Sequence, residues 1–250
     1  MTVAATMTQT WICFAVKEEL RPFARRVAGR GGLRLLLTGM GAPNARCALE
    51  QALDSAPALP DLVISSGFAG GLNPTLQRGQ VIFELPEVGA LPEGIQREPR
   101  CPGPGQETLG ILAAGLVQSG AVAGRFVQSH RVAVTVEEKQ SLHRSSGADA
   151  VEMESGALRE ICTARGIPCV VVRVISDAAD EPLPLDFNAL MTPDGRMDFR
   201  RLAGRLLRRP GLVPELLGFQ RRVATAAERL AVVLEAVTAA PPAANPRSKR

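Results

Sequence analysis

The sequence predicts a single-domain α/β fold, and three observations lead to that class. Residues 168–175 form a near-continuous apolar run, which is typical of a strand covered by helices on both faces of a sheet. Segments of strand character alternate with segments of helical spacing along most of the chain. No linker before residue 238 is long enough to divide the 250 residues, so one domain is the simplest prediction.

The individual elements follow from apolar periodicity and from helix-start signals. We predict strands over residues 11–16, 33–37, 61–66, 80–85, 125–129, 150–153 and 168–175. Helices are predicted from residue 17, from the turn at 39–45 to about 56, and over 107–118, 135–145, 156–165, 197–207 and 212–237. The best-marked helix start is Thr135, which has Glu138 three residues on as a capping box. Residues 86–106 are rich in Pro and Gly and predict a surface loop.

Composition narrows the function classes. The formal net charge is only +4, Tyr is absent, and no aromatic RNA-binding signature occurs, so a base-stacking nucleic-acid platform is not predicted. The five cysteines are odd in number and mostly lie in apolar runs, which indicates reduced core thiols and a cytoplasmic protein. The sequence has neither a signal-peptide pattern nor the roughly 18 to 20 apolar residues of a membrane span. His130 and His143 have no clustered Cys or acid, so no metal site is predicted.

Acidic residues gather where two predicted strands end. Glu152 and Glu154 lie at the end of the strand at 150–153, and Ser176 and Asp177 follow the strand at 168–175. Ligands of open α/β sheets bind at the carboxyl ends of strands. We therefore expect these side chains to border one crevice. For Ser176 and Asp177 the alternative is that they only cap the following helix.

Two other stretches have a functional and a structural interpretation. The glycines between Gly67 and Gly71 allow backbone N–H groups to approach a ligand closely, and a tight structural turn explains them equally well. Glu19 lies at a predicted helix start, where an acid suits the helix dipole as readily as it suits a site. The glycines at 39–41 do not form a dinucleotide fingerprint, because Asn44 stands in place of the third glycine.

Four motifs resemble the nucleoside phosphorylase/nucleosidase superfamily, and within it the methylthioadenosine/S-adenosylhomocysteine nucleosidases. They are Ala15-Val-Lys-Glu-Glu19, Ser66-Gly-Phe-Ala-Gly-Gly-Leu-Asn-Pro-Thr-Leu-Gln-Arg-Gly79, Val151-Glu-Met-Glu-Ser155 and Val172-Arg-Val-Ile-Ser-Asp-Ala-Ala-Asp180. The resemblance covers about residues 11–180. It implies a three-layer αβα fold with a central mixed sheet, cleavage of an N-glycosidic bond without a cofactor, and a homodimer. We expect this nucleosidase/phosphorylase-like domain over residues 10–238 and a disordered basic tail at 239–250.

The resemblance also implies roles for individual residues. Asp177 matches the residue that supplies a proton to purine N7, which requires a carboxyl group that holds a proton near the working pH. Glu154 matches the carboxylate that binds the ribose 2′- and 3′-hydroxyls, and Met153 matches the apolar floor beneath the sugar. Arg173 and Glu19 match the pair that holds the attacking water, with Glu19 as its base.

The remaining residues of the expected substrate site are less closely tied to one role. Glu152 is expected to face the sugar beside Glu154 only if their strand persists. The other expected substrate contacts are Ser176, Gly67, Phe68 and Ala69. Phe68 departs from the pattern, since nucleosidases usually have a small polar residue at that position near the sugar.

Hydrolysis is expected rather than phosphorolysis. A fixed carboxylate at Glu19 would oppose a phosphate dianion about 4 Å away by roughly 1 to 4 kcal/mol per charge pair. Phosphorylases resemble each other in a phosphate loop near the first strand, and Lys17-Glu-Glu19 stands there instead. The two alternatives are a purine nucleoside phosphorylase and a non-catalytic nucleoside sensor.

The C-terminal part is longer than in the nucleosidases of small substrates. Asp186-Phe-Asn-Ala-Leu-Met-Thr-Pro-Asp-Gly195 and the arginine-rich helices after it are similar to the hopanoid-associated members of the superfamily. That similarity implies release of adenine from adenosylhopane, a nucleoside with a bulky lipid at the 5′ position. Leucines and arginines interleave over residues 198–222, which suits peripheral contact with an anionic membrane. The alternative is a packed helix with a solvated arginine face.

Overall fold

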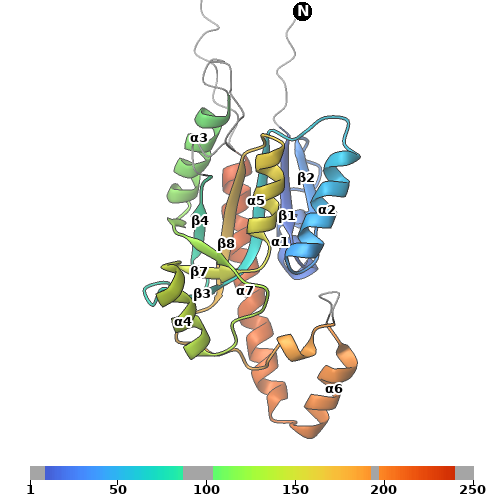
Figure 1. The fold of residues 1–250 in the computed structure, drawn as a ribbon, viewed down its shortest axis with the longest axis vertical. Coiled ribbons are helices and arrows are strands. Elements are labelled where there is room, and N and C mark those ends of the chain that lie inside the picture. Colours follow the sequence, from blue (N-terminus) through green and yellow to red (C-terminus); the bar gives the residue numbers. More distant parts are fainter. Residues whose placement is uncertain (1–8, 87–103, 193–196, 240–250) are drawn as a thin grey trace, which may run out of the picture.

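The computed structural model describes residues 9–86, 104–192 and 197–239, and its centre is an eight-stranded mixed sheet (Figure 1). The strand order is β2-β1-β3-β8-β4-β5, and β7 pairs with the far end of β3 and with β6. The strands are β1 (Thr10–Phe14), β2 (Leu33–Leu37), β3 (Leu62–Gly71), β4 (Val81–Glu84), β5 (Val122–Ala123), β6 (Phe126–Gln128), β7 (Ala150–Glu152) and β8 (Cys169–Asp177). The mixed sheet and its flanking helices confirm the predicted fold class.

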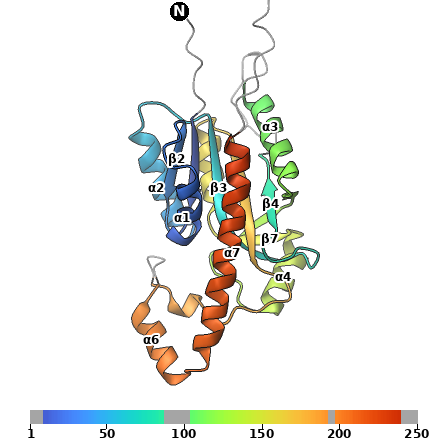
Figure 2. The same ribbon diagram turned by 180° about the vertical axis from the view of Figure 1, so that it is seen from behind.

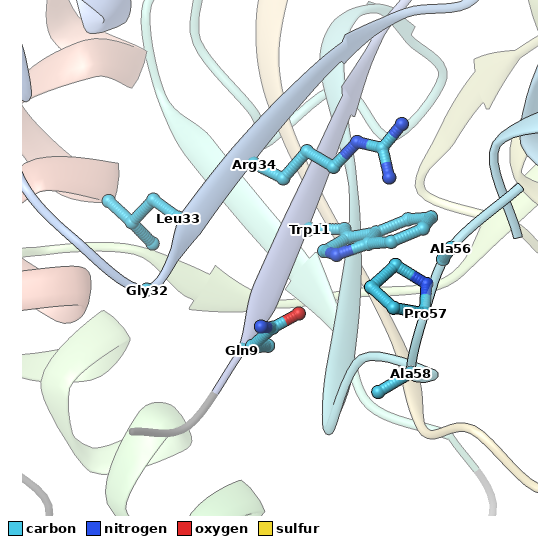
Figure 3. A pocket seen from close by; sticks show the side chains of 8 residues that line it. All are labelled: Gln9, Trp11, Gly32, Leu33, Arg34, Ala56, Pro57 and Ala58. Atoms are coloured by element: carbon cyan, nitrogen blue, oxygen red, sulfur yellow. The ribbon is translucent and has the colours of Figure 1, made fainter. Parts of the chain in front are cut away.

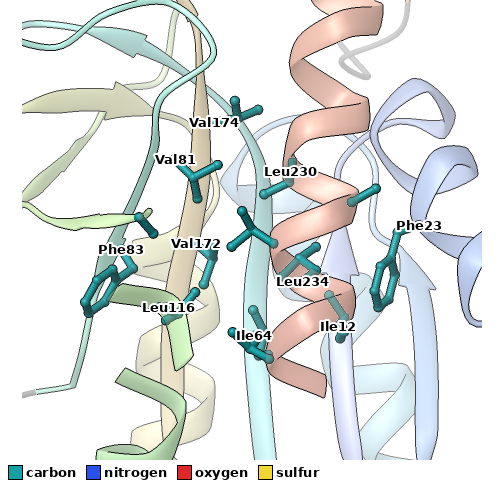
Figure 4. Close-up of a cluster of buried hydrophobic side chains, with 14 of the residues drawn as sticks. Ile12, Phe23, Ile64, Val81, Phe83, Leu116, Val172, Val174, Leu230 and Leu234 are labelled. Carbon is teal, nitrogen blue, oxygen red and sulfur yellow. The ribbon is translucent and has the colours of Figure 1, made fainter. Parts of the chain in front are cut away.

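The helices either cover one of the two faces of the sheet or lie beyond it (Figure 1). They are α1 (Lys17–Arg26), α2 (Ala42–Asp54), α3 (Pro104–Gln118), α4 (Val136–Ser146), α5 (Ser155–Ala164), α6 (Phe199–Arg208), α7 (Leu212–Ala239) and the short 3-10 helix η1 (Asn188–Leu190). One apolar core joins α1, α3 and α7 to one face of β1, β3, β4 and β8 (Figure 4). A second core joins α2 and α5 to the other face. The four cysteines in the described residues are free thiols, and Cys13, Cys162 and Cys169 are buried within that second core.

The buried strand at 168–175 is observed as β8, but its neighbours differ from those of a simple strand–helix–strand unit. β8 runs parallel to β3 and antiparallel to β4. The strand before α5 is β7, which pairs antiparallel with the end of β3 and does not pair with β8. The two acidic clusters therefore meet through β3, which both strands contact.

The glycines at 67–71 do not form the turn that the sequence suggested. β3 continues through them to Gly71, and its register against β8 shifts between Ala69 and Gly70. Gly67 has a φ of 147°, which residues other than glycine rarely adopt. This stretch therefore lies within the sheet and bends beside β8 and β7.

Two predicted segments fall mainly outside the described residues. The loop expected at 86–106 is described only at its ends, where residues 104–106 already belong to α3. The basic tail expected at 239–250 is described only at Ala239, which ends α7. The domain limits at 10 and 238 thus stay a prediction.

A helical arm, residues 197–225, leads away from the sheet and consists of α6 and the first half of α7 (Figures 1 and 2). Helix α6 contains no buried residue, and its Phe199 and Leu207 are 73% and 85% exposed. Further along, α7 returns to the body and buries Leu230 and Leu234 completely. Within the described residues, no helix is long and apolar enough to cross a membrane.

We expect Leu234→Ala to lower the free energy of unfolding by about 2–5 kcal/mol, because it opens a cavity in the larger core. Denaturant unfolding measures this change. Leu207→Ala is the matched control, since that leucine is exposed on the arm and should change stability by less than about 0.5 kcal/mol. Equal losses for both variants would contradict the assignment of α7 to the core and of α6 to the surface.

Candidate active site

Arg173 lies at the centre of a buried group of charged side chains. It projects from β8, is 1% exposed, and its Nη1 donates to the Ser66 carbonyl at 2.8 Å. Its Nη2 lies 2.6 Å from the Glu152 carboxylate and 3.4 Å from that of Glu154. A guanidinium stays protonated in proteins, so this position carries a permanent positive charge.

Glu19 reaches the same place from the start of α1. Its Oε2 accepts from the backbone N–H groups of Ala15 and Val16, and its Oε1 accepts from the N–H of Phe68 at 2.8 Å. Burial raises the pKa of Glu19 to about 7, and Arg173 and the backbone donors only partly oppose that shift. A carboxyl group with this pKa exchanges protons readily near neutral pH, as a general base must.

Gly67 provides the space in which Glu19 and Arg173 approach each other. A Cβ atom on Gly67 would lie 2.5 Å from the Arg173 Nη1 and 2.5 Å from the Glu19 Oε1. The structure thus brings the predicted pair together across the backbone of β3.

Phe68 is half-buried against the larger core, and its N–H is already used by Glu19. Ala69 is buried in a smaller cluster under the same strand.

Glu154 borders the group from the N-terminus of α5. Its Oε1 accepts from the N–H of Gly41 at 2.8 Å, and its Oε2 faces Arg173. Burial is the main cause that raises the pKa of Glu154, and the charge of Glu152 adds to it. Met153 beside it is half-buried.

Glu152 has a different place from the one expected beside the sugar. β7 ends at this residue, so the alternation that would put it on the same side as Glu154 is not continued. Its oxygens accept from the N–H groups of Glu154 and Ser155 and from the Ser155 hydroxyl, besides Arg173. Glu152 therefore caps α5 and holds the guanidinium.

Asp177 ends β8 and forms an ion pair that the sequence did not reveal. Its Oδ2 lies 2.5 Å from the Nζ of Lys139, a lysine of α4 that has no exposed surface. Its Oδ1 lies 2.5 Å from the Ser176 hydroxyl, which is also 3.2 Å from the Ala69 carbonyl. The expected helix after Asp177 is absent from the described residues 178–187, so the capping interpretation is wrong.

A cavity of about 300 Å³ opens beside Asp177 and Ser176. This volume is at the lower end of the range for small-molecule sites. The cavity is also lined by Arg78, Glu181, Pro182, Leu183, Phe219 and Arg222. Because Phe219 and Arg222 belong to α7, the helical arm forms one wall of it.

A second cavity of about 230 Å³ lies near the start of β1 and β2 and contains none of the predicted site residues (Figure 3). The guanidinium of Arg34 lies 4.3 Å above the centre of the Trp11 ring there. Among the described residues, no group of three or more His, Cys, Asp and Glu side chains could hold a metal ion.

Sequence reasoning missed two features of the site. Lys139 lies within Glu-Glu-Lys-Gln-Ser, a pattern typical of a solvated helix, and nothing in it signals burial. The second is the N–H of Gly41, which donates to Glu154 from a glycine turn whose sequence shows only that it is not a dinucleotide fingerprint. This hydrogen bond could have been anticipated by treating the N–H groups of each glycine turn as possible donors to the acids expected at the crevice.

Comparison with known proteins places this chain in a family. The model of the phosphorylase superfamily matches residues 12–84 and 98–208. The chain belongs to the phosphorylase superfamily. This membership confirms the superfamily prediction, while the hopanoid-associated branch within it stays a proposal.

Solved structures share the fold of this superfamily member at low sequence identity. Futalosine hydrolase of Helicobacter pylori is 16% identical with a TM-score of 0.62, over 94% of this chain and 99% of that one. The 5′-methylthioadenosine/S-adenosylhomocysteine nucleosidase of the same organism is 18% identical with a TM-score of 0.62, over 93% and 98%. The corresponding nucleosidase of Neisseria meningitidis, in complex with methylthio-immucillin-A, is 20% identical with a TM-score of 0.61, over 92% and 98%.

We expect Gly67→Ala to destabilise the protein by about 1–3 kcal/mol, because the new methyl group would overlap two buried, hydrogen-bonded side chains. Denaturant unfolding measures the loss. Gly110→Ala in α3 is the control, since its ideal Cβ position lies within 4 Å of no atom besides its chain neighbours and its own helix backbone, and alanine favours a helix. A Gly67→Ala protein as stable as the wild type would contradict the close approach of Glu19 and Arg173.

Proposed function

We propose that this protein hydrolyses the N-glycosidic bond of a purine nucleoside. The observation that carries the proposal is the buried Glu19 carboxyl group, whose pKa of about 7 suits a base for water and which lies beside Arg173. Asp177 stands at the end of β8 as the group that gives a proton to N7 of the departing base. Glu19 would thus assist the attack of water, and Asp177 would assist the departure of the base.

The sugar would lie between these two ends of the site. In our proposal Glu154 accepts hydrogen bonds from the ribose hydroxyls, and Met153 lies beneath the ring. The transition state of such a cleavage carries positive charge on the sugar. Glu154 and Glu19 are both buried carboxylates, and negative charge in a dry site stabilises that developing charge.

The charges favour water over phosphate as the nucleophile. Arg173 is the one guanidinium at the centre of the group, and Glu19, Glu152 and Glu154 all act on its charge. Three carboxylates around one cation leave no surplus positive charge for a phosphate dianion. This balance supports hydrolysis and makes the phosphorylase the second candidate. The sensor is disfavoured because acid, base and sugar-binding candidates are all present.

Adenosylhopane is the specific substrate that we propose, with adenine as the released base. Supporting this choice, Phe219 of the arm lines the cavity at Asp177 and lies 5.6 Å from the ring of Phe187. The same arm exposes Leu207 and Phe199 on α6. A bulky apolar 5′ substituent would need such a surface.

We also propose that the protein is a cytoplasmic homodimer that touches the inner membrane through the arm. The buried free thiols support a reducing compartment. The arm carries seven arginines over residues 198–222 against Asp198 and Glu215, so it has a basic margin beside its exposed apolar residues. The homodimer rests on the family resemblance alone.

The reaction class is tested by offering methylthioadenosine, adenosine, inosine and a 5′-alkyl adenosine in phosphate-free buffer. We expect free adenine from the adenosines, fastest for the 5′-alkyl compound, and no acceleration by added phosphate. Chromatography of base and sugar products measures both. Strict dependence on phosphate with formation of a sugar 1-phosphate would establish the phosphorylase instead, and binding without turnover would establish the sensor.

The pH dependence of kcat/KM tests Glu19 as the base. Since the carboxylate form is needed, kcat/KM should fall as the pH is lowered through about 7. Glu19→Gln should reduce the rate by at least about 10² and abolish this limb of the profile. A profile that stays flat from pH 8 to about pH 5, well below the midpoint, would remove Glu19 as the base.

Co-sedimentation with vesicles tests the membrane contact. We expect binding to vesicles that contain anionic lipid, weaker binding at high salt, and little binding to neutral vesicles. A Phe199→Asp and Leu207→Asp double variant should bind several-fold less. Leu59→Asp is the control, because Leu59 is 49% exposed and lies outside the arm. Equal binding of both variants would contradict a docking role for the arm.

A further inference from the structure

Lys139 is buried without any exposed surface, and all of its donors are directed at the end of β8 and the segment that follows it. Its Nζ lies 2.5 Å from the Asp177 Oδ2, 2.7 Å from the Ala178 carbonyl and 2.6 Å from the Glu181 carbonyl. An ammonium group has three donors, so these three acceptors satisfy it completely. The cation is thus fixed against the carboxyl group that stands at the base end of the site.

We propose that Lys139 is the proton reservoir of Asp177, so that the two residues act as one unit that supplies the proton taken up by the departing base. This inference rests on the proposed hydrolysis of a purine nucleoside. It also answers a difficulty in that proposal. The Asp177 Oδ2, which would carry the proton to the base, is already engaged by the Lys139 ammonium at 2.5 Å.

The transfer balances within the pair. The charged pair consists of an ammonium and a carboxylate, and the neutral pair of an amine and a carboxylic acid. Both pairs contain the same atoms, and removal of water disfavours the charged pair. When the nucleoside closes the cavity, the N–H bond of Lys139 breaks and an O–H bond forms on Asp177. That proton then moves to N7 as the C1′–N9 bond breaks, with its electron pair remaining on the base. The proton of the attacking water goes to Glu19.

The pair can be recharged because one of its members reaches the cavity. The Asp177 side chain is 10% exposed, whereas that of Lys139 is fully buried. After the base leaves, Asp177 takes a proton from solvent and passes it to the Lys139 amine, while Glu19 releases its own. One turnover therefore returns both residues to their starting state.

The surroundings accommodate both forms of the pair. The Ser176 hydroxyl has one proton and two acceptors, Asp177 Oδ1 and the Ala69 carbonyl. It can donate to Asp177 when the carboxylate is charged, and to Ala69 when Asp177 itself carries a proton. The carboxylate of Glu181 is occupied by Arg78 and by the Ala178 N–H, so it does not compete for Lys139. Arg222 is the remaining charged side chain that lines the cavity.

A purely structural lysine would hold the 178–181 segment and act on every substrate alike. The proton reservoir matters only for leaving groups that need a proton. The discriminating measurement therefore compares the best purine nucleoside with 4-nitrophenyl β-D-ribofuranoside, whose nitrophenolate leaves as a stable anion. The readout is the ratio of the two kcat/KM values for the full-length protein.

We expect Lys139→Met to lower kcat/KM for the purine nucleoside by about 10² to 10⁴, and for the nitrophenyl riboside by less than about tenfold. Asp177→Asn should show the same selectivity. Arg144→Met is the control for loss of a cation from the same helix, since Arg144 is exposed on α4, and it should change neither rate. Equal losses on both substrates for Lys139→Met would overturn the reservoir and leave a structural lysine.

The double variant Lys139→Met with Asp177→Asn keeps the test decisive if Lys139→Met does not fold, because it removes both charges together. Its purine rate should equal that of Asp177→Asn alone, as for residues that act as one unit. A further tenfold loss would overturn the proposal.

The outcomes separate this inference from the proposed function. A wild-type protein that hydrolyses neither substrate would overturn both. An active wild-type protein whose ratio of the two kcat/KM values is unchanged in Lys139→Met would overturn the inference alone.

Discussion

The buried guanidinium of Arg173 is the constraint on which the rest of the site depends. Burial would lower the pKa of Arg173, yet the charges of Glu152, Glu154 and Glu19 together raise it. The same single cation serves three carboxyl groups, and it does not offset the burial of them all. Burial consequently raises the pKa of Glu19 and of Glu154. The shortage of positive charge around Arg173 thus raises the pKa of the two carboxyl groups to which we assign the roles of base and sugar contact.

The sheet is what makes this arrangement possible. Arg173 comes from β8, Glu19 from the helix that follows β1, and Glu152 and Glu154 from the junction of β7 and α5. These segments converge on β3, whose Gly67 has no side chain to keep the guanidinium and the carboxylate apart. The site is therefore assembled from contacts between segments up to about 150 residues apart in the chain, and no local motif contains it.

Much of the fold could be predicted from the sequence because it is encoded locally. The apolar run that became β8 and the Thr135 capping box of α4 needed only their own residues. The continuation of β3 through 67–71 could not be predicted, since glycines usually end strands and their reasons are distant contacts: Gly67 makes room for Arg173 and Glu19, and Gly70 and Gly71 lie against β8. The burial of Lys139 could not be predicted, because charged residues are expected at the surface unless a partner is known, and its partner Asp177 lies far along the chain. For Glu152, the sequence did not reveal the pairing with Arg173.

In our proposal, burial beside Arg173 makes Glu19 a proton acceptor near neutral pH. Titration of the Glu19 side-chain carboxyl carbon by NMR, assigned with Glu19→Gln, measures this property directly and without any substrate. We expect a midpoint near pH 7. A midpoint close to the ordinary glutamate value of about 4.3 would contradict it.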